Sequence, residues 1–172
     1  MAERRLFFGL WPDDRQRNML RDQIQPAISG VEGNAVNRRN WHVTLVFIGE
    51  FPEEKMPELM VRSMHVDVTP FRLRMDRVSY WARPKIACLQ ALTVPDELRQ
   101  LKADLEEVVS HFGIAAEKAD YKPHITAVRN ARPFEPARLA RTVELRWDSF
   151  ELIESIPGSG GPTYRPVKQE LL

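Results

Sequence analysis

The sequence is poor in cysteine, and it has neither a long apolar run nor an excess of charge of one sign. Cys88 is the single cysteine in 172 residues, which excludes a disulfide within the chain and a four-thiolate zinc site, and suits a reducing compartment. The apolar run over residues 6–11 is too short for a secretory signal or a membrane span. We therefore expect a cytoplasmic protein that makes no use of a membrane.

The overall charge gives no sign of a nucleic-acid partner. The chain has 25 Lys and Arg against 24 Asp and Glu, so a polyanion site would have to be local. Residues 118–146 carry seven Lys and Arg against three acids, whereas residues 96–117 carry two bases and six acids. The near-neutral total thus hides a basic region beside an acidic helix, although a solvated charged face explains the same pattern.

Length and composition are those of one folded domain. Hydrophobic residues make up 43% of the chain and charged residues 28%, as in ordinary globular proteins. In the first half, an apolar strand over residues 6–11 precedes a helix that begins at Pro12 and has Met19, Leu20 and Ile24 on its apolar face. Pro26 is expected to end this helix, residues 29–34 to form a loop, and residues 41–48 to form a strand.

The second half repeats this order of elements. A strand over residues 86–92 precedes a helix that begins at Pro95 and stops at Gly113, and a strand over residues 124–128 follows. The spacing from the helix-opening proline to the next strand histidine is 30 residues in the first half and 29 in the second. We interpret this as an internal duplication, so that residues 1–172 form a single domain of two pseudo-symmetric lobes.

The remaining elements are predicted from shorter patterns. Phe71, Leu73 and Met75 alternate with polar residues, which predicts an antiparallel strand, and the alternation slips before Val78, which predicts a bulge. A helix is expected over residues 59–64, and strands are expected around residues 143–147, 150–152 and 164–167.

A His-x-Thr triplet stands at the same place in each half. The two triplets are His42-Val43-Thr44 and His124-Ile125-Thr126. Side chains two positions apart in a strand project from one face, so each triplet presents an imidazole and a hydroxyl together. A single strand histidine is most often hydrogen-bonded within a core, but the equivalent placement of two triplets favours a function.

Two histidines on opposite sides of a cleft suit an in-line displacement at phosphorus. One neutral imidazole can take a proton from the attacking oxygen while the other, as imidazolium, protonates the departing oxygen. The hydroxyls of Thr44 and Thr126 can bind the phosphoryl oxygens as charge builds on them. Arg129, five residues after His124, is the candidate cation for the same task, with a solvated surface arginine as the alternative.

The paired triplets, in their contexts Trp41 to Glu50 and Pro123 to Arg129, resemble those of the two-histidine phosphoesterases. Within these, the chain is most similar to the LigT-like RNA 2′,3′-cyclic phosphodiesterases, also called 2′-5′ RNA ligases, over nearly its whole length. The resemblance implies an α+β, bilobed fold of two antiparallel sheets with flanking helices around a central cleft. It also implies hydrolysis of a terminal 2′,3′-cyclic phosphate to a 2′-phosphate without metal or cofactor.

The resemblance also assigns roles to the site residues. His42 would be the acid toward the 3′ oxygen and His124 the base for water, with Thr44, Thr126 and Arg129 on the phosphate. Phe47, five residues after His42, would lie near the nucleobase, but regular strand alternation puts it on the face opposite His42 unless a bulge intervenes. The glycine-rich loop over residues 158–161 either offers backbone amides to phosphate or is an ordinary turn.

Two other kinds of enzyme are disfavoured by the sequence. A metal hydrolase would draw its ligands from His42, His65, His111 and His124, but neither triplet carries a second ligand at metal spacing. An ATP-dependent ligase would need a nucleotidyl-lysine, and Lys102-Ala103-Asp104 and Lys118-Ala119-Asp120 lack its glycine. Any ligation should therefore reverse the opening of a cyclic phosphate and need no nucleotide cofactor.

Two other functions remain open alongside the RNA phosphodiesterase. The chain could act on small cyclic nucleotides, or it could be a non-catalytic module that binds RNA or nucleotides. The expected partners are RNA ends or nucleotides that carry a 2′,3′-cyclic phosphate. We expect a monomer with no obligate protein partner.

Overall fold

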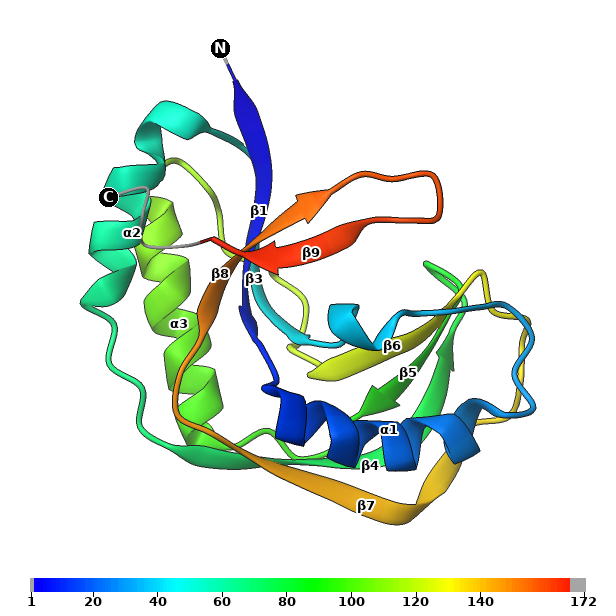
Figure 1. Ribbon diagram of the computed structural model, residues 1–172. Coiled ribbons are helices and arrows are strands. Elements are labelled where there is room, and N and C mark those ends of the chain that lie inside the picture. Colours follow the sequence, from blue (N-terminus) through cyan, green and yellow to red (C-terminus); the bar gives the residue numbers. More distant parts are fainter. Residues whose placement is uncertain (1, 168–172) are drawn as a thin grey trace.

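The computed structural model describes residues 2–167, which form an α+β fold with two antiparallel sheets (Figure 1). The first sheet has the strand order β3-β1-β8-β9, and the second has the order β2-β6-β5-β4-β7. The strands are β1 (Glu3–Leu10), β2 (Asn34–Ala35), β3 (Val43–Pro52), β4 (Phe71–Trp81), β5 (Ile86–Gln90), β6 (His124–Arg129), β7 (Ala137–Trp147), β8 (Glu151–Ile156) and β9 (Thr163–Pro166). The α-helices are α1 (Asp14–Ile28), α2 (Met56–Met64) and α3 (Asp96–Ser110), and short 3₁₀ turns are η1 (Arg38–Asn40) and η2 (Glu53–Lys55). The predicted fold class is confirmed.

Each of the two longer helices covers the sheet to which its preceding strand does not belong. Helix α1 follows β1 of the first sheet and packs on β6 and β7 of the second, and α3 follows β5 of the second sheet and packs on β3 of the first. Figure 1 shows α1 along the second sheet, with α2 and α3 side by side against the first. Each sheet is therefore covered by a helix that follows a strand of the other sheet, so the apolar face of each sheet is buried only when both halves of the chain are folded.

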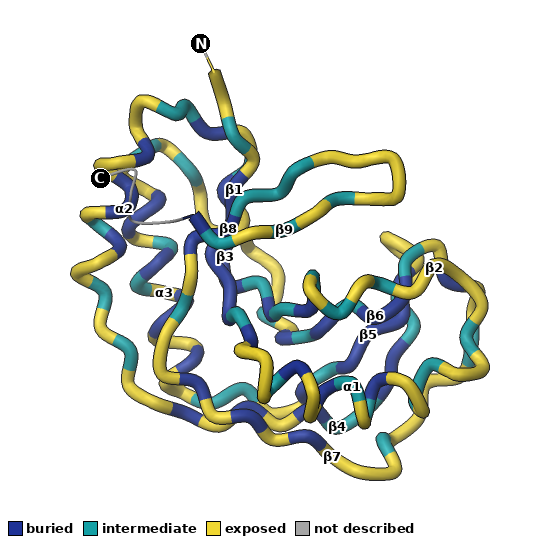
Figure 2. Tube along the Cα trace, viewed as in Figure 1, coloured by how far each residue is buried: buried dark blue, intermediate teal, exposed yellow. Residues whose placement is uncertain are grey.

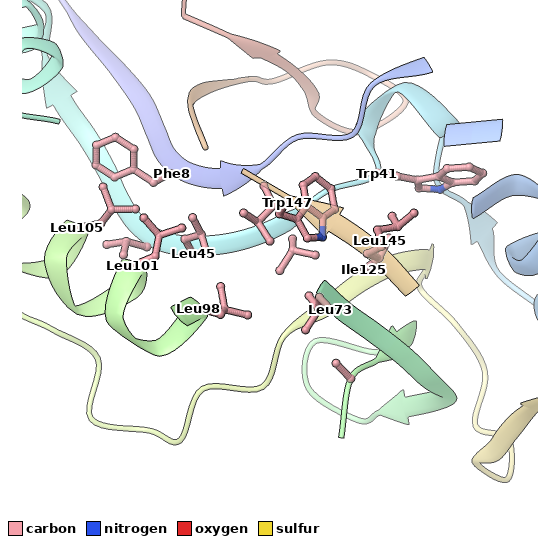
Figure 3. Close-up of a cluster of buried hydrophobic side chains, with 14 of the residues drawn as sticks. Phe8, Trp41, Leu45, Leu73, Leu98, Leu101, Leu105, Ile125, Leu145 and Trp147 are labelled. Carbon is pink, nitrogen blue, oxygen red and sulfur yellow. The ribbon is translucent and has the colours of Figure 1, made fainter. Parts of the chain in front are cut away.

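A single apolar core fills the space between these layers. Buried side chains of both sheets and all three α-helices belong to one continuous cluster. In Figure 3, Phe8 and Leu45 of the first sheet pack on Leu98, Leu101 and Leu105 of α3, and the cluster continues to Leu73, Ile125, Leu145 and Trp147 of the second sheet. Figure 2 shows the buried trace running along the central strands, whereas the loops are exposed. The two sheets are therefore held in a fixed relation by shared packing.

Helix α1 differs from the sequence prediction in two respects. It runs through Pro26 to Ile28, because an exposed proline in the last turn removes only one backbone hydrogen bond, and the Ser29 hydroxyl donates to the Pro26 carbonyl. Its buried residues are Arg17, Leu20 and Ile24, whereas Met19 is 45% exposed. The predicted apolar face is thus right at Leu20 and Ile24 and wrong at Met19, and Arg17 is buried beside them.

The other predicted elements are close to those observed. The slip in β4 is a register irregularity opposite β7 between Met75 and Arg77, as the alternation predicted. Residue 34 of the expected loop starts the short strand β2, which pairs with β6. Cys88 is fully buried in β5, and burial raises the pKa of its thiol to about 12, so it is an unreactive core residue. Among residues 2–167, no helix is long and apolar enough to span a membrane.

Candidate active site

A cleft of about 1120 Å³ lies between the two sheets and contains both His-x-Thr triplets. His42 and Thr44 border it from the start of β3, and His124 and Thr126 border it from β6. Arg129, Phe47, and residues 158 and 161 of the glycine-rich loop line the same cleft. The structure thus brings together every residue that the sequence proposed for the site.

Hydrogen bonds to the backbone fix the tautomer of each histidine. Nδ1 of His42 lies 2.7 Å from the carbonyl oxygen of Asn40, and Nδ1 of His124 lies 2.9 Å from that of Lys122. A carbonyl can only accept, so each Nδ1 carries a proton. In the neutral ring each Nε2 is then unprotonated. The Thr44 hydroxyl, 2.9 Å away, donates to Nε2 of His42.

Aromatic rings surround both imidazoles. The His42 ring lies 4.8 Å from Phe7, 5.0 Å from Tyr164 and 6.4 Å from Trp11, measured between centroids. The His124 ring lies 4.3 Å from that of Trp81, which also lines the cleft. These rings limit the movement of the imidazoles and exclude water from their faces.

Burial lowers the pKa of both histidines below the usual 6.5. Desolvation is the main cause for His42, whose pKa falls to about 4, and the positive charges of His124, Arg129 and Arg17 lower it further against the opposing hydrogen bond to Asn40. Desolvation also lowers the pKa of His124, opposed by its hydrogen bond to Lys122. Both rings are therefore neutral at pH 7, and an anion bound beside them would favour the imidazolium form.

A β-bulge follows each triplet and decides where the next functional side chain points. In the pairing of β1 with β3, the register passes from Gly9 opposite Thr44 to Phe8 opposite Val46, which leaves Leu45 as the extra residue. In the pairing of β5 with β6, Cys88 lies opposite Thr126 and Ala87 lies opposite Val128, which leaves Ala127 as the extra residue. The bulge occupies the position directly after the threonine in both strands.

These bulges reverse the alternation of side chains beyond them. Phe47, opposite Phe7, therefore shares the face of Thr44, and Arg129, opposite Ile86, shares the face of Thr126. Regular alternation would have placed both residues on the far side of their strands. Phe47 is 54% exposed at the cleft, so it is not a core residue.

Tyrosines that the sequence did not single out join the two halves of the site. The Tyr121 hydroxyl, just before β6, donates to the backbone carbonyl of Thr44 in β3 over 2.8 Å. Nη2 of Arg129 donates to the Tyr164 hydroxyl of β9 over 2.6 Å. Their contacts span 77 and 35 residues of sequence, so no local pattern could have identified them.

Asn40 ties the β8–β9 hairpin to the loop that holds His42. Its Nδ2 donates to the Pro162 carbonyl over 2.9 Å, and its Oδ1 accepts from the Tyr164 backbone N–H over 3.1 Å. Its own carbonyl accepts the Nδ1 proton of His42. Asn40 thus positions the first imidazole and the glycine-rich loop together.

The further side chains that a metal hydrolase or an ATP-dependent ligase would need do not lie in the cleft. His65 and His111 cap the ends of α2 and α3, away from the cleft lining. Within residues 2–167, no three His, Cys, Asp or Glu side chains lie together as a metal site would need. Lys102 on α3 is buried beside Glu106 and the ring of Tyr121, so it serves packing.

Comparison with known proteins agrees with this geometry. A family model described as "LigT like Phosphoesterase" matches residues 10–88. The RNA 2′,3′-cyclic phosphodiesterase of Archaeoglobus fulgidus is 30% identical over 95% of this chain and 98% of its own length. This chain belongs to the LigT-like phosphoesterase family.

Solved structures of LigT have the same fold as this LigT-like phosphoesterase. The apo form of Escherichia coli LigT superposes with a TM-score of 0.82 at 26% identity, covering 98% of this chain and 96% of that one. Its complex with 3′-AMP gives a TM-score of 0.81 with 97% coverage of both chains. The LigT-like phosphoesterase described here is therefore a phosphoric diester hydrolase.

Proposed function

We propose that this LigT-like phosphoesterase hydrolyses the terminal 2′,3′-cyclic phosphate of RNA to a 2′-phosphate by acid–base catalysis with its two histidines. The observation that carries the proposal is the pair of imidazoles, each with Nδ1–H bound to a backbone carbonyl two residues earlier. Nε2 of each ring is thereby the nitrogen left to exchange a proton with a ligand in the cleft. Relatives named RNA 2′,3′-cyclic phosphodiesterase support the substrate class.

In the proposed reaction, Nε2 of neutral His124 takes a proton from a water molecule whose oxygen attacks phosphorus. The bond from phosphorus to the 3′ oxygen breaks, and that oxygen takes the proton from Nε2 of protonated His42. The products are a 2′-phosphate and a 3′-hydroxyl, and exchange of protons with solvent restores the starting state. Each proton transfer contributes roughly 10²–10⁴-fold to the rate.

The negative charge of the substrate favours the protonated form of His42 that the reaction needs. Burial lowers the pKa of His42 to about 4, so the ring by itself is neutral near pH 7. A cyclic phosphate carries one negative charge, and an anion beside the ring raises its pKa. The hydroxyls of Thr44 and Thr126 and the guanidinium of Arg129 are the groups that line the cleft to receive the phosphoryl oxygens.

The same arrangement extends to a 2′-5′ ligation without ATP. If the 5′-hydroxyl of a second RNA strand takes the place of water, His124 removes its proton and the product is a 2′-5′ phosphodiester. The cleft, at about 1120 Å³, is larger than the usual 300–1000 Å³ of a site for one small molecule. A cleft of this volume has room for the end of an RNA strand as well as for a single nucleotide.

The test is product analysis on a short RNA with a 2′,3′-cyclic phosphate end, in excess EDTA. We expect a 2′-phosphate product, with hydrolysis lost in His42→Ala and in His124→Ala. His65→Ala and His111→Ala, which lie at helix ends, are the controls and should keep full activity. Activity that survives in both cleft variants, or that disappears with EDTA, would contradict the two-histidine reaction.

A further inference from the structure

A second groove borders the active-site cleft and is lined mainly by arginines. It has a volume of about 760 Å³, and its charged residues are Arg17, Arg38, Arg39 and Arg165 against the single acid Asp14. We call it the arginine groove. Tyr164 lines both the groove and the cleft, and Trp11 of the groove lies 6.4 Å from the ring of His42. The groove therefore begins beside the proposed acid.

Arg17 supplies a buried charge at this groove. Its side chain comes from α1, is only 8% exposed and stacks 4.7 Å from the ring of Trp11. Nε of Arg17 donates to the carbonyl of Arg38, but Nη2 has no hydrogen-bond partner among the described residues. A buried cation without an ion pair is costly, and an anion in the groove would offset that cost.

Of the other three arginines of the groove, two lack an acidic partner among the described residues. Arg38 donates from Nη2 to the amide oxygen of Asn18, and neither Arg38 nor Arg39 has a carboxylate within salt-bridge distance in residues 2–167. Arg165 lies 3.4 Å from Glu154, a carboxylate that also lies 3.5 Å from Arg4. The acids that face Arg17 are the exposed Asp13, which caps α1, and the exposed Asp14 in its first turn. The groove therefore keeps a net positive charge.

The active-site cleft itself does not share this charge. Its lining has four acids, Glu3, Glu50, Glu117 and Glu154, against four bases, Arg4, Arg5, Arg83 and Arg129. A chain of phosphates that leaves the site would therefore meet no net attraction along the cleft but would be attracted along the arginine groove. Among the surfaces that adjoin His42, the groove is thus the favoured path for a polyanion.

We propose that the arginine groove binds the backbone phosphates of the nucleotides that precede the cyclic phosphate end of an RNA. This inference rests on the proposed function, and it makes an oligonucleotide, not a mononucleotide, the preferred substrate. Arg38 and Arg39 hold the phosphates at the rim, and Arg17 adds its charge from beneath. Their contacts are to phosphate and so carry no base preference.

The test compares a 2′,3′-cyclic mononucleotide with a tetranucleotide that ends in the same cyclic nucleotide. In Arg38→Gln/Arg39→Gln, we expect kcat/KM to fall about tenfold for the tetranucleotide and to stay unchanged for the mononucleotide. The slope of log kcat/KM against log salt for the tetranucleotide should weaken by about 1.4, because about 0.7 is lost per phosphate contact with a single strand. The control Arg62→Gln/Arg141→Gln removes the same charge from α2 and β7, outside the groove, and should leave both substrates unaffected.

Equal kcat/KM values for both substrates in the wild type, or an equal loss on both in the groove variant, would overturn the inference while the proposed function stands. The inference would also be overturned if Arg38→Gln/Arg39→Gln changed only the inhibition of hydrolysis by inorganic phosphate, because the groove would then bind free phosphate and not RNA. Binding of the tetranucleotide with a plain 3′-hydroxyl, followed by fluorescence anisotropy, tests the groove even if neither substrate is hydrolysed. We expect that binding to weaken in the groove variant alone.

Discussion

The lowered pKa of His42 predicts a specific loss of stability in acid. Its pKa is about 4 in the folded chain, against 6.5 for an ordinary histidine. Between these values the unfolded state binds more protons than the folded state, so stability is full above pH 6.5 and falls as the pH drops toward 4. For this shift, linkage gives a loss of at most about 1.4 kcal/mol at pH 5.5 and about 2.5 kcal/mol at pH 4.5.

The perturbation that isolates this effect is His42→Gln. The glutamine amide is polar but does not titrate, so the variant should lack this part of the acid sensitivity. Urea unfolding at pH 7.5, 5.5 and 4.5, followed by tryptophan fluorescence, gives the free energy of unfolding of each protein. We expect the wild type to lose about 2 kcal/mol more than His42→Gln between pH 7.5 and 4.5.

The control is His111→Gln, at the end of α3, which should follow the wild type at every pH. Parallel pH dependences for the wild type and His42→Gln would refute the argument that burial holds the ring neutral.

Two further predictions concern activity and packing at the same site. Because the pKa values of both histidines lie below 6.5 in the free enzyme, kcat/KM should peak below pH 6.5 and fall about tenfold per pH unit above that pH. The decline of kcat should begin at a higher pH, because bound phosphate raises the pKa of His42. A kcat/KM optimum above pH 8 would contradict this prediction. Tyr121→Phe, which removes only the hydroxyl that donates to Thr44, should lower the free energy of unfolding by about 1 kcal/mol, as measured by urea unfolding, and unchanged stability would show that the bond contributes nothing.

The sequence alone predicted the fold class and singled out the two histidines of the proposed catalytic pair. The apolar periods over β1, β3, β5 and β6 are local features, and so is the spacing of each histidine and threonine along its strand. Two residues two apart on a regular strand share a face whatever the rest of the chain does. The His-x-Thr pairs could therefore be recognised without the structure, and the cleft contains both of them.

The positions of Phe47 and Arg129 depended on the tertiary structure. Each lies beyond a bulge, at Leu45 and at Ala127, that exists only in the pairing with a neighbouring strand. The sequence of β3 by itself was compatible with a buried Phe47 or with one that faces the cleft. For Arg129, the sequence showed only its spacing of five residues from His124. Strand pairing is non-local, so the face of a side chain past a bulge cannot be read from alternation.

The arginine groove and the contacts that join the halves were also decided by packing. Arg17 takes a buried position on α1 because Trp11 and the Arg38 carbonyl receive its guanidinium, and the helical pattern gave no sign of this burial. Asn40, Tyr121 and Tyr164 act on residues distant in sequence. The sequence thus singled out the groups proposed to carry the chemistry. Only the three-dimensional contacts determined the orientation of these groups, their protonation and the charge of the surface beside them, because burial and strand pairing involve residues from the whole chain.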